Sequence, residues 1–213
     1  MKRKTASFTG QRPIFTGSVA IVPGGFNLDV VNQSFHVGVI IPAGSLAIFD
    51  EAKRTVQIVK TATVSSVNAE DSKVVTLKVD EFYEPIFAVG DKVAKIGAIS
   101  GTYADAAAIT AINRTPGSYV ITLDKVISGL AEGDGIEQVV ADSTGNAAEV
   151  GKANGVTICD VEVDEFETSV DVTADTIQYA LYERRVPVIP ATQKDVTGNF
   201  LNVNPHVKFT QSY

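Results

Sequence analysis

Two stretches of this chain, VSSVNAEDSKVVTL (64–77) and ITAINRTPGSYVITL (109–123), follow the same pattern. Each begins with apolar and small residues, passes through an asparagine and a polar turn, and ends in an apolar run that closes with Thr-Leu. Apolar runs on either side of a short polar turn are typical of a β-hairpin. Because a lone hairpin cannot bury its apolar face, the two copies predict paired hairpins that close one shared core.

The repeat continues beyond the hairpins, since AVGDKV (88–93) aligns with AEGDGI (131–136). Each unit is therefore predicted as a strand, an asparagine turn, a strand, a connection, a Gly-Asp turn and a third strand. The two units span residues 62–106 and 107–140. A coincidental likeness between two unrelated hairpins remains open as the alternative.

The segments around the repeat also favour strands. Short apolar runs before it and apolar alternation after it are bounded by Pro and Gly turns, and no segment of 12 or more residues has a strong helical period. We predict an all-β fold in which a small β-barrel of two hairpin repeats, residues 61–140, is inserted into a β body of residues 18–60 plus 141–213. Residues 1–17 are expected to form an extended arm, and residues 141–155 a surface loop. Strands are expected at 18–22, 35–41, 45–49, 55–60, 155–163 and 169–186.

The amino-acid composition limits the classes of function that the chain can have. The 213 residues carry a net charge of −7, which disfavours bulk attraction to nucleic acid. No apolar run reaches the length that spans a bilayer, and no apolar segment follows the basic start, so we expect neither a membrane anchor nor a signal peptide. A single cysteine, Cys159, fits folding in a cytoplasm.

Charge is distributed unevenly along the chain. Residues 1–60 carry a net +4 and residues 141–180 a net −8. A basic arm and an acidic body suit docking to another surface or to a neighbouring copy, although simple solvated faces remain an alternative. The residues predicted to contact a partner are Lys2, Arg3, Lys4, Arg12, Arg184 and Arg185.

No catalytic constellation emerges from the sequence. Cys159 lies in apolar alternation, which favours a buried, inert thiol, and nothing brings His36 and His206 together. The stretch 159–175 holds seven carboxylates, and its alternation places Asp160, Glu162 and Asp164 on one strand face. Calcium binding there is one hypothesis, but a solvated face or one that meets a partner's Lys and Arg is favoured. We therefore predict no enzyme activity, cofactor or metal.

Three segments resemble the head decoration and head fibre proteins of tailed bacteriophages. They are IIPAGSLAIFD (40–50), ANGVTICDVEV (153–163) and ADTIQYALYERRVPVIP (174–190), on both sides of the repeat. The resemblance implies a decoration-protein-like β domain in a non-enzymatic virion component. It further implies binding to the outer capsid lattice, with the major capsid protein or another virion protein as partner, commonly as trimers. The protein would be made in the bacterial host cytoplasm and end in the virion.

A carbohydrate- or cell-surface-binding module is the alternative function. The stretch EFYEPIF (81–87) is apolar enough to form a binding lip, and a glycan would stack on its aromatic rings. A corner of the core is the favoured interpretation of the same stretch. The aromatic candidates are Phe82, Tyr83, Phe87 and Tyr103.

Overall fold

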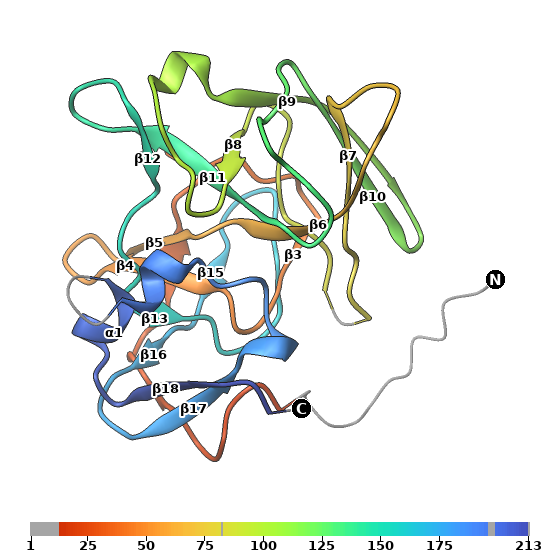
Figure 1. Cartoon of the computed structure of the whole chain (residues 1–213). Helices are drawn as coiled ribbons and strands as arrows, with labels where there is room; N and C mark the ends of the chain where they lie inside the picture. The colour runs from red at the N-terminus through yellow and green to blue at the C-terminus, as the bar shows by residue number, and fades with distance from the viewer. Residues whose placement is uncertain (1–12, 82, 196–198, 213) are drawn as a thin grey trace.

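The computed structural model describes residues 13–81, 83–195 and 199–212, and most of their regular structure is β-strand (Figure 1). Helix is limited to α1 (Phe200–Val203) and to the 3-10 turns η1 (Tyr103–Asp105), η2 (Glu183–Arg185) and η3 (Ala191–Lys194). No helix in these ranges is long and apolar enough to cross a membrane. The prediction of an all-β fold with a small barrel is confirmed.

Six strands close the barrel at the top of Figure 1. Every neighbouring pair is antiparallel, in the order β6-β7-β10-β9-β8-β11 and back to β6. Closure gives each of these six strands a neighbour on both sides. The strands are β6 (Thr61–Val67), β7 (Val74–Leu77), β8 (Lys92–Lys95), β9 (Ala107–Thr115), β10 (Ser118–Leu123) and β11 (Gly135–Ala141).

The two sequence repeats occupy equivalent places in this barrel. The middle strands of the two units pair with each other, so that Val75 faces its own counterpart, Ile121. The amide of Gly90 donates to the carbonyl of Ile109 (2.8 Å), and the amide of Gly133 donates to the carbonyl of Val64 (2.9 Å). Since Val64 and Ile109 align in the repeat, each unit makes the same contact with the other, as a two-fold relationship requires.

The barrel core follows from strand alternation. Along β10, every second side chain is buried, beginning with Tyr119 and ending with Leu123, and Ile121 between them is completely buried. Burying one aliphatic side chain of this size stabilises the fold by about 1.5–3 kcal/mol. The core combines apolar positions shared by the two repeats, such as Val75 and Ile121, with Tyr119, which has no apolar counterpart in the first repeat.

The remaining sheets form the body below the barrel. Its largest sheet has the order β13-β4-β5-β2-β15, and its members come from both sides of the repeat. They are β2 (Phe26–Leu28), β4 (Leu46–Asp50), β5 (Thr55–Ile58), β13 (Gly155–Val156) and β15 (Ser169–Val170). The two-stranded pairs are β1 (Ala20–Ile21) with β16 (Thr173–Ala174), β3 (Ile40–Ile41) with β14 (Val161–Glu162), and β17 (Tyr179–Tyr182) with β18 (Val207–Thr210).

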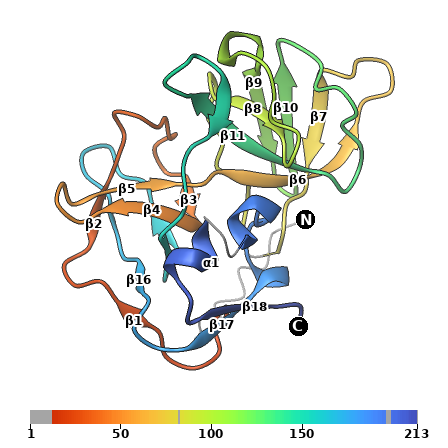
Figure 2. The same ribbon diagram turned by 60° about the vertical axis from the view of Figure 1, so that its left-hand side comes forward.

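Barrel and body are connected by a very short link. The chain leaves β5 at Ile58 and enters β6 at Thr61, with only Val59 and Lys60 between them, so the two strands follow one another (Figure 2). It returns along β11 and passes through β12 (Ala147–Glu149), which pairs with β11, before it re-enters the body. The segment 141–155, predicted as a loop, therefore contains a short strand.

Several body strands are shorter than predicted. The run 155–163 is interrupted between β13 and β14, where the Thr157 hydroxyl bonds the Pro42 carbonyl (2.9 Å) and Asp160 accepts a bond from the amide of Ala43 (2.8 Å). Such bonds between side chains and backbone replace ladder bonds, which ends the strand. The run 169–186 is likewise divided into β15, β16 and β17.

The predicted arm, residues 1–17, lies largely outside the described residues, which begin at Pro13. Ile14 is buried, and Phe15 forms a bridge with Leu181 of β17. The amide of Thr16 donates to the carbonyl of Ala180 (2.9 Å). Residues 14–16 therefore run along β17 as part of the body.

Candidate functional site

A buried ion pair connects the barrel to the body. The ammonium group of Lys60, which follows β5, lies 2.8 Å from the Asp91 carboxylate in the Gly-Asp turn before β8. The Lys60 side chain is fully buried and that of Asp91 nearly so. Lys60 also donates to the carbonyl of Ser34 and lies 4.3 Å from the centre of the Phe35 ring. Burial lowers the pKa of the Lys60 ammonium, and the attraction of Asp91 opposes this shift.

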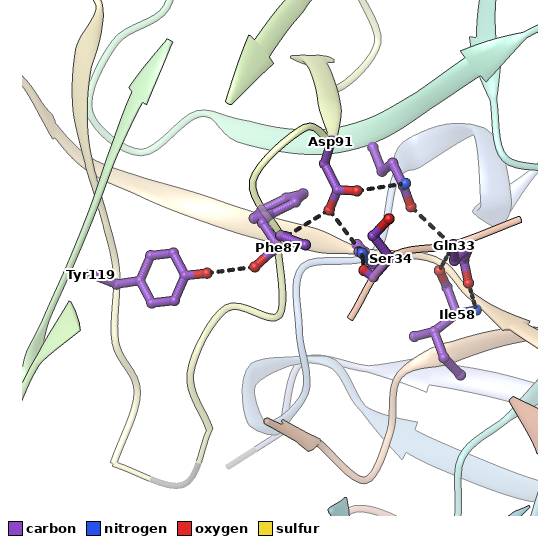
Figure 3. A network of polar contacts seen from close by, with 9 residues as sticks. Gln33, Ser34, Ile58, Phe87, Asp91 and Tyr119 are labelled. Carbon is purple, nitrogen blue, oxygen red and sulfur yellow. Dashed lines mark hydrogen bonds and ion pairs between the residues drawn. The ribbon is translucent and has the colours of Figure 1, made fainter. Parts of the chain in front are cut away.

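Two buried glutamines extend this ion pair into a network (Figure 3). The Gln138 amide on β11 donates to Asp91 (3.1 Å) and accepts from the Gln33 amide (2.9 Å). Gln33 also bonds both the amide and the carbonyl of Ile58 (2.7 and 2.8 Å). Because its groups are paired, the network can fix the orientation of the barrel without leaving a free polar atom for chemistry. We call these residues, Gln33, Lys60, Asp91 and Gln138, the joint.

The C-terminal segment adds two contacts across the same boundary. The Thr61 hydroxyl donates to the carbonyl of Val188 (2.6 Å), and the Tyr83 hydroxyl donates to that of Val186 (3.0 Å). A crevice beside them, lined by Tyr83, Ile86 and Val188 among others, offers about 20 Å³. That volume holds one water molecule and no organic substrate.

Glu137 is the most perturbed carboxyl group of this region. It pairs with Thr61 across β11 and β6, so its side chain faces the C-terminal segment that Thr61 contacts. It is 1% exposed, and its Oε1 has no hydrogen-bond partner among the described residues. Burial, assisted by the nearby charge of Glu149, raises the pKa of Glu137 to about 8. The protonated form is therefore favoured at neutral pH.

The structure does not assemble the residues considered for nucleophilic catalysis. Cys159 is partly buried in a bend rather than fully buried in a strand, and burial followed by the charges of Asp171 and Asp160 raises the pKa of its thiol. The two histidines have separate partners: His36 bonds the Val37 carbonyl (2.7 Å), and His206 lies 3.0 Å from Asp175. Neither histidine contact involves the thiol, so no activated nucleophile is present there.

The acidic face follows the alternation expected from sequence. Asp160, Glu162 and Asp164 are exposed, while Val163 is buried. Asp160 and Asp164 accept backbone bonds, from Ala43 and Glu165 respectively. Across the described ranges, no three His, Cys, Asp or Glu side chains gather as a metal site would require. The calcium hypothesis therefore gains nothing from the geometry.

The aromatic candidates for a glycan site are dispersed. Phe87 is buried in the barrel core, and its carbonyl accepts the Tyr119 hydroxyl (3.0 Å; Figure 3). Tyr83 belongs to the boundary described above, and Tyr103 is covered by the Lys92 ammonium at 4.5 Å from its ring. Phe82 lies outside the described residues. The described residues 83–87 thus form a corner of the core at the barrel–body boundary.

The basic residues predicted to bind a partner differ in their surroundings. Lys2, Arg3, Lys4 and Arg12 lie outside the described residues. Arg184 is exposed and reaches Gln211 (3.4 Å). Arg185 is half-buried, donates to the Pro13 carbonyl (2.7 Å) and lies 4.4 Å from the centre of the Tyr182 ring. Arg185 therefore holds residue 13 at the end of β17.

The joint was not identified from sequence. The sequence pattern predicts Lys60 as the last residue of the strand 55–60. No pattern indicates that Gln33 or Gln138 is buried. One signal was present: Asp91 recurs as Asp134 in the second repeat, and both follow a glycine. A repeated Gly-Asp turn indicates a structural requirement of the barrel, but it does not reveal which copy meets the body.

Comparison of the chain with protein families, with curated proteins and with solved structures found no match in any of the three.

Proposed function

We propose that the chain is a non-enzymatic structural protein of a bacterial virus, bound to the outer surface of the capsid. More specifically, we propose that it is a decoration or head fibre protein. The proposal starts from the resemblance of segments 40–50, 153–163 and 174–190 to such proteins, and one structural observation supports it.

That observation is the meeting of the three segments in one hydrophobic cluster. Leu46 comes from the first segment, Val156 from the second and Leu181 from the third, and all three are buried together. The first two segments also pair directly, through Leu46 with Val156 and Ile41 with Val161. Three resembling pieces that are separated in the chain by the barrel thus form one unit. This is expected if they descend from a single ancestral domain.

The chemistry of the described residues is consistent with attachment rather than catalysis. The buried charges of Lys60 and Asp91 are engaged in the joint, and Glu137 is buried in its protonated form. The crevice beside the joint admits one water molecule. A compact β body with a rigidly oriented barrel suits a protein that is held against other molecules. The basic residues at the start of the chain and Arg184 are the proposed contacts with the virion partner.

The direct test uses capsids assembled from the major capsid protein encoded near this chain. We expect the purified chain to co-sediment with these capsids at a saturable ratio and to detach as salt is raised, because exposed charge pairs are screened. If no capsid gene lies in the same gene cluster, or if saturable binding is absent at low salt, the proposal fails.

A matched pair of variants tests the basic residues. Lys2→Glu/Arg3→Glu/Lys4→Glu reverses three charges of the N-terminal segment, and Lys53→Glu/Lys73→Glu/Lys125→Glu reverses three exposed charges elsewhere. We expect the first variant to lose capsid binding and the second to keep most of it. Deletion of residues 2–12 serves as a further test, because it spares the buried Ile14. Binding of a fluorescent glycan array by the chain, with no binding to capsids, would favour the alternative function.

A further inference from the structure

Several large apolar side chains are exposed on adjoining segments of the body. Phe166 and Val31 are each 90% exposed, which is unusual for residues of this size. A large contiguous apolar patch on a soluble protein is commonly a place where another molecule binds. We call this group the Phe166 surface; it consists of Val30, Val31, Val37, Ile40 and Phe166, which are all exposed.

The loop that carries Phe166 is held at both ends. On one side, the amide of Val163 donates to the carbonyl of Val39 (2.8 Å). On the other, the carbonyl of Thr168 accepts from the amide of Leu28 (2.9 Å). The Thr168 hydroxyl also accepts from the amide of Asp164 (2.9 Å), which closes the loop into a tight turn. The turn therefore presents Phe166 outward from a fixed base.

The neighbouring turn presents two valines in the same way. Asp29 accepts bonds from the amide and the side chain of Asn32 (3.1 and 2.8 Å), and its carbonyl accepts the amide of Gln33 (3.1 Å). Val30 and Val31 form the tip of this turn. Its base is Leu28, the residue bonded to Thr168, so the two turns rise side by side from one hydrogen-bonded pair.

The surface is bordered by carboxylates. Glu162 pairs with Ile40 across β14 and β3, so the two exposed side chains share one face. Glu165 and Glu167 flank Phe166 directly in the chain and are also exposed. None of the three glutamates has an ion-pair partner among the described residues. The segments 13–52 and 153–183 contain no Lys or Arg. Two basic residues beside them are already engaged, since Arg54 lies over the Phe26 ring and Lys60 is paired with Asp91.

An occupant of the Phe166 surface must therefore combine basic and apolar groups. Residues 2–12 of the same chain have this composition, since Lys2, Arg3, Lys4 and Arg12 accompany Phe8. The segment contains no acidic residue. The charge excess of this segment thus complements the uncompensated carboxylates of the surface.

The anchoring of residues 13–16 favours an occupant from a second copy. Pro13 is bonded to Arg185, and Ile14 is buried in the cluster that contains Leu181. The Phe166 surface overlies a different cluster, which contains Leu28, Val39 and Val163. The described residues therefore start at a different hydrophobic cluster from the one beneath the Phe166 surface. We propose that the Phe166 surface of one copy binds the basic segment 2–12 of a second copy.

This interface can be tested without capsids, because it forms between copies of the chain in solution. On a particle it would compete with the proposed capsid contact for Lys2, Arg3 and Lys4. The interface also gives a function to the acidic stretch 159–175, which forms no catalytic or metal site among the described residues.

Zero-length carbodiimide coupling tests the proposal on the full chain. Protein labelled with ¹⁵N is mixed in equal amounts with unlabelled protein and allowed to exchange before coupling, and the linked peptides are identified by mass spectrometry. We expect hybrid links, with one isotope on each side, between Lys2 or Lys4 and Glu165 or Glu167. Links within one isotope only would place the segment on its own body, and the absence of links at these glutamates would place it elsewhere. Either result overturns the proposal.

Charge reversal supplies the complementary test by sedimentation velocity. Glu165→Lys/Glu167→Lys should raise the dissociation constant of self-association at least about tenfold. The control Glu70→Lys/Glu132→Lys makes the same charge change on the barrel, where both residues are exposed, and should leave the dissociation constant unchanged. Combining the first change with Lys2→Glu/Arg3→Glu/Lys4→Glu should restore association. A monomeric wild-type chain, or equal effects of test and control, would refute the interface whatever the outcome with capsids.

Discussion

Asp91 and Asp134 occupy equivalent positions in the two halves of the barrel, and their carboxylates make equivalent contacts. Each accepts a hydrogen bond from the backbone amide three residues earlier, from Ala88 at 2.8 Å and from Ala131 at 2.7 Å. Each also accepts from the equivalent position of a neighbouring strand, Gln138 in one case and Lys95 in the other. The turns differ in their surroundings, since Asp91 is buried against the body and Asp134 is partly exposed.

This difference predicts unequal costs for the same substitution. Asp91→Asn keeps an acceptor for the turn but leaves the Lys60 ammonium buried without a counter-charge. We expect a loss of about 3 kcal/mol or more in the free energy of unfolding. Asp134→Asn leaves a Lys95 that water can still reach, so a loss below about 1 kcal/mol is expected. Urea denaturation of the two variants measures both values, and equal losses would contradict a special role of the joint.

A second prediction concerns Gly44 in the Pro-Ala-Gly turn of segment 40–50. Its φ of +87° favours glycine, and a Cβ there would lie 2.1 Å from the Val186 side chain in segment 174–190. Gly117 has a similar φ of +81° but open space around it. We expect Gly117→Ala to cost about 1 kcal/mol, and Gly44→Ala about 3 kcal/mol because overpacking adds to the backbone strain. Thermal unfolding compares the two variants, and a similar loss at both positions would argue against this close approach.

The sequence was sufficient to predict the barrel because its pattern is local and occurs twice. Each repeat carries its own turn residues and alternation, and the core positions Val75 and Ile121 can be read from that alternation. The pairing of β3 with β14 could not be predicted, because more than a hundred residues separate them and many registers fit such short strands. The joint was missed for a related reason. The burial of Lys60 depends on a partner 31 residues away, which no periodicity indicates.

The candidate surfaces could likewise be predicted only in part from the sequence. The acidic stretch 159–175 was evident from composition, and its exposed face was predicted correctly for Asp160, Glu162 and Asp164. The exposure of Phe166 was not predicted, because an isolated aromatic residue between two glutamates is as compatible with a buried position in the core as with an exposed one. Arg185 was grouped with partner-binding residues, yet its half-buried contact with Pro13 arises only once the ends of the chain come together.

A third prediction uses the pKa of Glu137, which burial raises to about 8 in the folded chain from 4.5. Between these values the unfolded chain releases a proton that the folded chain retains. The contribution of Glu137 to stability is therefore complete below about pH 4.5 and decreases as pH rises toward 8. Glu137→Gln removes this dependence, so we expect the variant to gain on the order of 2–4 kcal/mol over wild type between pH 5 and pH 8. Urea titrations at both values measure the change.

The exposed Glu132 offers a control for this pH effect. Glu132→Gln should follow the wild-type stability at every pH, because its side chain is exposed in the folded chain. If Glu137→Gln runs parallel to wild type across this range, the carboxyl group is not buried in its protonated form.

The last prediction concerns Arg185 and the start of the body. Its guanidinium donates to the Pro13 carbonyl and lies over the Tyr182 ring, and both contacts hold residues 13–16 against β17. Arg185→Ala should make this segment open more often, so the amide of Thr16, which bonds Ala180, should exchange with deuterium about tenfold faster. The amide of Ile109, bonded to Asp91 in the barrel, should keep its rate. Arg184→Ala changes the adjacent exposed arginine and should leave Thr16 protected. Equal acceleration in both variants would mean that a general loss of positive charge, rather than the Pro13 contact, controls the segment.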